Sequence, residues 1–252
     1  MLIAHISDCH LRTDGRPLKD EIDSRATLRA CIAHLASLEP KPDAVLVTGD
    51  LAHTGRPEDY QTLRRAFEEL EAPVYVVPGN KDSRENLRRA FGSWGYLPSA
   101  GEFLHYAVED HPVFLIGLDT QREDSEDGEL CARRLRWLEA RLAEEPDRPA
   151  IVFMHHPPIG HAAGFEGSGE MEEIIHRHPQ VARVVGGHVH AQLVESWGGT
   201  VASTAASVAF QIGPELVAGV ALESAVTPPV CPMYRLRPDK WVIEHVNPVG
   251  VT

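Results

Sequence analysis

The sequence predicts an α/β fold in which two β-sheets pack as a sandwich with helices on the outside. Strand and helix patterns alternate between residues 2 and 91, and the second half of the chain is rich in strand patterns. Polar side chains suited to metal binding follow several of these strands, where α/β folds place their sites. Alternation alone would fit one doubly wound sheet, but the strand-rich second half favours two sheets.

The composition limits the size and the partners of the protein. Its 252 residues and 43% hydrophobic content are enough for one large α/β domain with a small annex. The formal net charge of -13 disfavours a surface that binds nucleic acid polymers. No run is long and apolar enough for a membrane span, and residues 1–6 lack the basic start of a signal peptide. We therefore expect no membrane partner. Because the four cysteines show no CxxC spacing, we also expect a reduced, cytoplasmic protein.

Short β-branched or apolar runs predict the strands. We expect them at residues 2–7, 43–48, 73–77, 103–108, 113–118, 150–154, 181–185, 193–197, 200–203, 207–212, 231–236 and 241–246. The last two form a hairpin, as do 193–197 and 200–203 around Gly198 and Gly199.

Apolar residues at helical spacing predict five helices. We expect them at residues 21–38, 57–70, 84–91, 130–144 and 171–176. Pro57 suits an early helical position, and Ser83 can cap the helix that follows it. The acidic stretch 121–129 predicts a mobile surface loop.

Five segments place carboxylate, imidazole or amide side chains just after strand patterns. They are Asp8-Cys9-His10, Gly49-Asp50, Gly79-Asn80-Lys81-Asp82, His155-His156-Pro157-Pro158 and Gly187-His188-Val189-His190. Side chains alternate along a strand, so Asp8 and His10 share one face while Cys9 points away. Each segment alone also fits a loop of solvated side chains, but together they indicate a metal site. Carboxylate, imidazole and amide ligands without thiolate suit Mn²⁺, Fe²⁺ or Zn²⁺.

In this order the five segments resemble the calcineurin-like metallophosphoesterase superfamily, over roughly the first 210 residues. The chain is most similar to its bacterial class III cyclic nucleotide phosphodiesterases and glycerophosphodiesterases. Gly49-Asp50-Leu51, the stretch from Gly55 to Tyr60, Pro78-Gly79-Asn80 and a C-terminal extension carry this closer similarity. The resemblance implies the αββα fold, with a catalytic domain over residues 1–212 and a small strand extension over residues 213–252. By analogy, the hairpin of the extension is expected to act as a cap or as the dimerisation element of a homo-oligomer.

The resemblance also implies two divalent metal ions about 3.5–4 Å apart. Seven side chains would hold them: Asp8, His10 and His190 on the first ion, Asn80, His155 and His188 on the second, and Asp50 as the bridge. His155 is taken as the ligand because it comes first after its strand. His156 is expected either to face the substrate or to support His155 through a hydrogen bond.

The implied reaction is hydrolysis of a small phosphodiester, of the cyclic nucleotide or glycerophosphodiester type, by in-line attack of a metal-bound hydroxide. The family usually has histidine after the Gly-Asn pair, where this chain has Lys81. We expect the Lys81 ammonium to bind a phosphoryl oxygen or to protonate the leaving alkoxide. Phosphomonoesterase or pyrophosphohydrolase activity at the same metals is the alternative. A non-catalytic interaction scaffold is a third hypothesis, which the complete ligand set disfavours.

Overall fold

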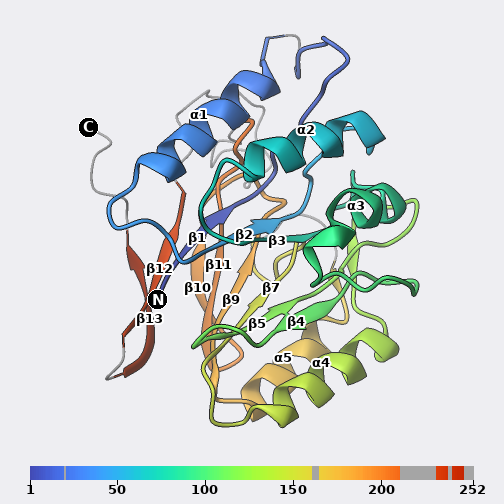
Figure 1. Ribbon diagram of the computed structural model, residues 1–252. Coiled ribbons are helices and arrows are strands. Elements are labelled where there is room, and N and C mark those ends of the chain that lie inside the picture. The colour runs from blue at the N-terminus through green and yellow to red at the C-terminus, as the bar shows by residue number, and fades with distance from the viewer. Residues whose placement is uncertain (20, 161–164, 211–230, 238–239, 247–252) are drawn as a thin grey trace.

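Two β-sheets face each other, and helices cover their outer sides, so that the layers are ordered α, β, β, α (Figure 1). The computed structural model describes residues 1–19, 21–160, 165–210, 231–237 and 240–246. The predicted sandwich of two sheets flanked by helices is confirmed. Among the described residues, no helix combines the length and the apolar composition needed to cross a membrane.

The first sheet has the strand order β13-β12-β1-β2-β3. The three strands β1, β2 and β3 are parallel, whereas β12 runs antiparallel to β1, and β13 antiparallel to β12. The predicted C-terminal hairpin is therefore a continuation of this sheet. The bounds are β1 Leu2–Ile6, β2 Ala44–Thr48, β3 Val74–Val77, β12 Met233–Arg237 and β13 Lys240–Val246, with helices α1 Ser24–Ser37, α2 Pro57–Phe67 and α3 Arg84–Phe91.

The second sheet has the order β10-β11-β9-β7-β5-β4, and β5, β7, β9 and β11 run parallel. Helices α4 and α5 cover its outer side, opposite α1 and α2 (Figure 1). The bounds are β4 Tyr106–Val108, β5 Phe114–Gly117, β7 Ala150–Phe153, β9 Val181–Gly186, β10 Val194–Trp197, β11 Thr200–Thr204, α4 Ala132–Glu144 and α5 Ser168–Arg177. A 3₁₀ turn η1 (Gly92–Trp94) and two short paired strands, β6 (Gly128–Glu129) and β8 (Phe165–Glu166), were not predicted.

The hydrophobic core explains why the site lies at one edge of both sheets. β1, β2, β3, β5 and β7 are buried along their whole length, as expected for parallel strands covered on both faces. Asp8, Asp50 and His155 each follow two residues after the last residue of β1, β2 and β7, where these strands leave the core. Parallel strands end at a common edge, so these side chains gather there.

The buried carboxylate of Asp82 ties the turn after β2 to the turn after β3. Its Oδ2 accepts hydrogen bonds from the backbone N–H groups of Leu51 (3.1 Å) and Gly79 (2.9 Å). Its Oδ1 accepts from the Ala52 N–H at 3.1 Å and from the Tyr60 hydroxyl of α2 at 2.9 Å. The spacing of these two turns is thus fixed by one side chain.

One predicted strand, 207–212, is wrong over its described part. Ser207 forms a single parallel bridge with Ser7, and no strand continues through Phe210. The Ser207 hydroxyl oxygen accepts from the N–H groups of Ala209 (3.0 Å) and Phe210 (3.1 Å), which closes a turn. Gln211 and Ile212, and with them the expected domain boundary, lie outside the described residues.

The first helix begins three residues later than predicted, at Ser24 instead of residue 21. Asp23 is the N-cap, and its side chain accepts from the backbone N–H groups of Arg25 and Ala26. Ser83 caps α3 through the Asn86 N–H, as predicted.

We expect Asp82→Asn to destabilise the fold by about 3 kcal/mol, because the amide nitrogen must face two of the four donors and leave them unsatisfied. Urea unfolding in the presence of a chelator measures this. Asp147→Asn makes the same charge change at an exposed position between α4 and β7 and should stay within about 0.5 kcal/mol of the unchanged protein. Equal stabilities for the two variants would contradict the structural role of Asp82.

Candidate metal centre

Asp8, His10 and His190 converge beyond the ends of β1 and β9, as the sequence predicted. The Nε2 atoms of His10 and His190 lie 3.0 Å apart, and Asp8 Oδ1 lies 3.3 Å from His190 Nε2. Asp8 Oδ1 is buried and makes no hydrogen bond of acceptable geometry with the described residues. A cation among these three atoms would supply the partner that this oxygen lacks.

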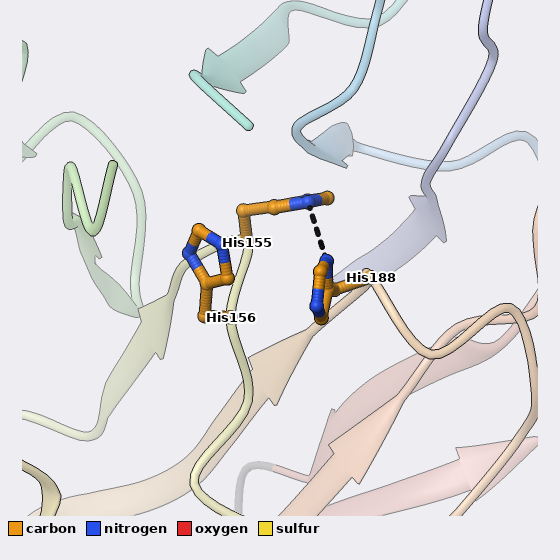
Figure 2. A group of neighbouring side chains, drawn as sticks. All are labelled: His155, His156 and His188. Carbon is orange, nitrogen blue, oxygen red and sulfur yellow. Dashed lines mark hydrogen bonds between the residues drawn. The ribbon is translucent and has the colours of Figure 1, made fainter. Parts of the chain in front are cut away.

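Asn80, His155 and His188 form a second group beside the first. His155 Nε2 lies 3.0 Å from Asn80 Oδ1 and 3.2 Å from His188 Nδ1. Figure 2 shows the His155 and His188 rings turned toward each other, with His156 beside them. The structure therefore brings together the three residues expected on the second ion.

The Asp50 carboxylate lies between the two groups. Its Oδ2 is 3.6 Å from His10 Nε2, and its Oδ1 is 3.5 Å from His155 Nε2. The backbone N–H of Lys81 donates to Asp50 Oδ1 at 2.8 Å and fixes the orientation of the carboxylate. One oxygen of Asp50 therefore faces each group, which is the arrangement expected of a bridging ligand.

Outer hydrogen bonds select the ring nitrogens that face the centre. His155 Nδ1 donates to the Thr48 carbonyl at 2.8 Å, and His190 Nδ1 donates to the Phe210 carbonyl at 3.0 Å. Because a carbonyl oxygen only accepts, the proton sits on Nδ1, and Nε2 presents its lone pair to the cluster. This is the tautomer that a metal-binding histidine requires.

Burial favours the neutral form of three candidate ligands, His10, His155 and His188. It lowers the pKa of His155 to about 3, and it lowers the pKa values of His10 and His188 below their ordinary range. Burial, followed by the charge of Asp8, raises the pKa of the Asp50 carboxyl well above its usual range. Burial also opposes ionisation of Asp8, but the neighbouring His190 ring holds the pKa of Asp8 well below its ordinary value.

The donor set fits divalent metal ions. Neutral imidazoles offer lone pairs, and a dication between Asp8 and Asp50 would offset the repulsion between their carboxylates. Cys9 packs in the hydrophobic core, so no thiolate joins the cluster. Imidazole, carboxylate and amide oxygen together suit first-row transition metals.

The backbone at the ligands is strained. Seven non-glycine residues of the described chain have positive φ, and five of them are candidate ligands: Asp8, His10, Asp50, His188 and His190, with φ between 41° and 69°. Such left-handed conformations cost free energy in residues with a side chain and cluster at functional sites. Sequence patterns gave no indication of this conformation.

Two glycines allow the ligand turns to meet. A Cβ atom at Gly187 would lie 1.8 Å from Ser7 Oγ, and one at Gly79 would lie 2.3 Å from the backbone nitrogen of Asp50. Neither position has room for a side chain. The glycines that precede His188 and Asn80 are therefore required by the close approach of neighbouring turns.

His156 is held by hydrogen bonds on both ring nitrogens. Its Nε2 donates to the Glu126 carbonyl at 3.1 Å, and its Nδ1 lies 2.9 Å from the Thr120 hydroxyl. Burial lowers the pKa of His156 well below its usual value, so the ring is neutral. The ring lies beside His155 and His188, but its hydrogen bonds run to Thr120 and Glu126, so the expected role of His156 at the site stays a prediction.

The Lys81 side chain lies beside Asn80 and forms an ion pair with Glu126. Glu126 was not singled out in the sequence, because the stretch 121–129 has only its acidic composition as a signal. His53 was also missed, although its Nδ1 lies 3.4 Å from His10 Nδ1. A histidine three residues after Asp50 was the only available signal.

The chain matches the model of the calcineurin-like phosphoesterase family over residues 1–192. It is 32% identical over 252 residues to the glycerophosphodiester phosphodiesterase GpdQ of Enterobacter lignolyticus, an alignment that covers 96% of this chain and 89% of that protein. It is 26% identical over 203 residues to the 3',5'-cyclic adenosine monophosphate phosphodiesterase CpdA of Escherichia coli K12, covering 78% of this chain and 72% of that one.

Among solved structures, a dimetal phosphatase from Danio rerio has the same fold, with a TM-score of 0.68 at 16% identity. That comparison covers 94% of this chain and 93% of the other. Since the family match takes in all seven candidate ligands and the GpdQ relative aligns along nearly the whole chain, the protein belongs to the calcineurin-like phosphoesterase family, whose members use divalent metal ions.

Proposed function

We propose that this protein hydrolyses small phosphodiesters at a centre of two divalent metal ions. The observation that carries the proposal is the position of Asp50, with one carboxylate oxygen toward each of two groups of candidate metal ligands. The names of the two relatives, a glycerophosphodiesterase and a cyclic nucleotide phosphodiesterase, support a phosphodiester of one of these types. The family supports the reaction class, and the metal pair is assigned to Mn²⁺, Fe²⁺ or Zn²⁺ from ligand chemistry.

Each residue has a distinct task in this mechanism. Asp8, His10 and His190 would hold one ion, Asn80, His155 and His188 the other, and Asp50 both. When bound, such a pair supplies Lewis acidity and lowers the pKa of a coordinated water.

Lys81 faces a cavity of about 530 Å³ that opens beside Asn80. Its ammonium group can bind a non-bridging phosphoryl oxygen or donate a proton to the leaving alkoxide. His156 supports the site through its contacts with Thr120 and Glu126.

Hydrolysis of monoesters or pyrophosphates at the same metals is the second candidate, because Lys81 replaces the histidine expected after Asn80. The scaffold hypothesis is disfavoured, since the seven ligand side chains lie together and outer hydrogen bonds orient His155, His190 and Asp50. A cytoplasmic location and a homo-oligomer built on β12 and β13 remain predictions.

With metals bound, we expect bis(p-nitrophenyl) phosphate and cyclic AMP to be hydrolysed with a higher kcat/KM than p-nitrophenyl phosphate. The panel is measured under one buffer and metal condition. A monoester preference of about tenfold, equal to about 1.4 kcal/mol in transition-state free energy, would instead support the second candidate.

We expect Asp50→Ala to lower kcat more than about 100-fold and to reduce bound metal, because loss of a bridge weakens both sites. Metal content per protein by elemental analysis and initial rates measure the two effects. Asp147→Ala, an exposed aspartate, is the control and should retain both. Full metal occupancy and near-normal rates in Asp50→Ala would show that the centre is wrongly assigned.

We expect chelation to abolish activity and Mn²⁺ to restore it more effectively than Mg²⁺. The reason is that His10, His155, His188 and His190 offer imidazoles, which transition metals bind better than Mg²⁺ does. Metal binding should also raise the melting temperature of the protein. Tight and complete restoration by Mg²⁺ alone would argue against the proposed ligand set.

A further inference from the structure

The acidic loop, residues 121–127, is closed at its base and packed beside the metal centre. Gln121 and Gly128 form an antiparallel bridge, and the Glu129 N–H donates to the Thr120 carbonyl at 2.9 Å. Arg84 Nη2 donates to the Gln121 carbonyl at 2.7 Å. These contacts fix where the loop leaves and re-enters the fold, and its expected mobility stays a prediction.

Glu126 is the residue by which the acidic loop meets the centre. Its carbonyl oxygen accepts from His156, and its carboxylate pairs with the Lys81 ammonium group. The hydrogen bond from Lys81 and then the charge of Lys81 lower the pKa of Glu126, and His188 adds a smaller effect in the same direction. The carboxylate is therefore ionised and within electrostatic reach of a candidate metal ligand.

The cations that line the cavity beside Asn80 are each paired with carboxylates. Arg84 binds Asp119 at 2.7 Å, and Arg122 lies 3.5 Å from Glu166. Lys81, which is the cation next to Asn80, is paired with Glu126. The protein thus offers an incoming phosphate group a cation whose charge is already balanced.

Charge distinguishes the two substrate classes proposed above. A phosphodiester carries one negative charge, whereas a phosphomonoester carries nearly two at neutral or mildly alkaline pH. A carboxylate paired with Lys81 beside the phosphate subsite repels the second class more strongly, because the Coulomb energy scales with the charge of the ligand.

We propose that Glu126 is a specificity-determining residue, a role that rests on the proposed function. By pairing with Lys81, Glu126 favours monoanionic diesters and disfavours dianionic monoesters. It acts through Lys81 and through its own charge. It takes no part in bond making or breaking.

The test compares Glu126→Gln with the unchanged protein, both loaded with Mn²⁺, on p-nitrophenyl phosphate and bis(p-nitrophenyl) phosphate at pH 8. We expect the ratio of monoester to diester kcat/KM to rise about fivefold, mainly through a lower monoester KM. Calorimetric titration with inorganic phosphate should show about fivefold tighter binding. This titration tests the charge effect even if the protein hydrolyses neither ester. A lack of hydrolysis would refute the proposed function but not the effect of Glu126 on phosphate binding.

Glu123→Gln is the matched control, since it removes the same charge from the same loop at a side chain that is similarly exposed but lies 3.9 Å from Arg84 and is not paired with Lys81. It should change the ratio less than about twofold. Glu126→Asp keeps the charge and should restore most of the original preference. In a Lys81→Ala background, Glu126→Gln should have a smaller effect on the ratio, because the pair is already broken.

A parallel loss on both esters in Glu126→Gln, with unchanged phosphate affinity, would overturn the inference and leave Glu126 as a structural residue of the loop. An equal shift in Glu123→Gln would also overturn it, because the effect would then follow from net charge and not from contact with Lys81.

Discussion

The four hydrogen bonds accepted by Asp82 are the constraint on which the site depends. They join the turn that carries Asp50 to the turn that carries Asn80, and the Tyr60 hydroxyl extends the link to α2. Tyr60 also accepts from the Ser83 N–H at 2.8 Å, so the start of α3 belongs to the same network. A buried carboxylate needs all of these donors, and the turns therefore cannot separate without a large cost in free energy.

Hydrogen bonds from main-chain N–H groups extend this constraint to the turn after β1 and, through the Asp8 side chain, to the second sheet. The backbone N–H groups of Asp8 and His10 donate to the carbonyls of Gly49 and Asp50, at 3.1 Å and 2.8 Å. The His188 N–H donates to Asp8 Oδ2 at 2.9 Å, which links the turn after β9 to the turn after β1. These contacts stabilise the turns that contain the left-handed ligand residues and hold the donor atoms of the candidate centre close to one another.

The net negative charge of the protein does not conflict with a negatively charged substrate, because the substrate responds mainly to the charges close to the metal centre. The carboxylates of Asp8 and Asp50 face inward to the proposed metal positions, where dications would reverse the local field. The charge seen by a substrate is then set by few groups, chiefly Lys81 and its partner Glu126. The net charge of -13 describes the remaining surface and not the centre.

The sequence by itself determined the two-sheet fold and the five segments that carry the candidate ligands, because apolar runs and the polar residues that end them are local patterns; the choice of seven ligands within these segments came from the family resemblance. Parallel strands end at one edge, so residues as distant as Asp8 and His190 could be expected to meet. Only the tertiary structure decided the turn at Ser207, the positive φ of the ligands, the role of Asp82 and the pairing of Glu126 with Lys81. The role of Asp82 and the pairing of Glu126 depend on partners far apart in the chain, which leave no periodic signal. The turn at Ser207 is made by local hydrogen bonds, but its apolar neighbours by themselves also fit a strand.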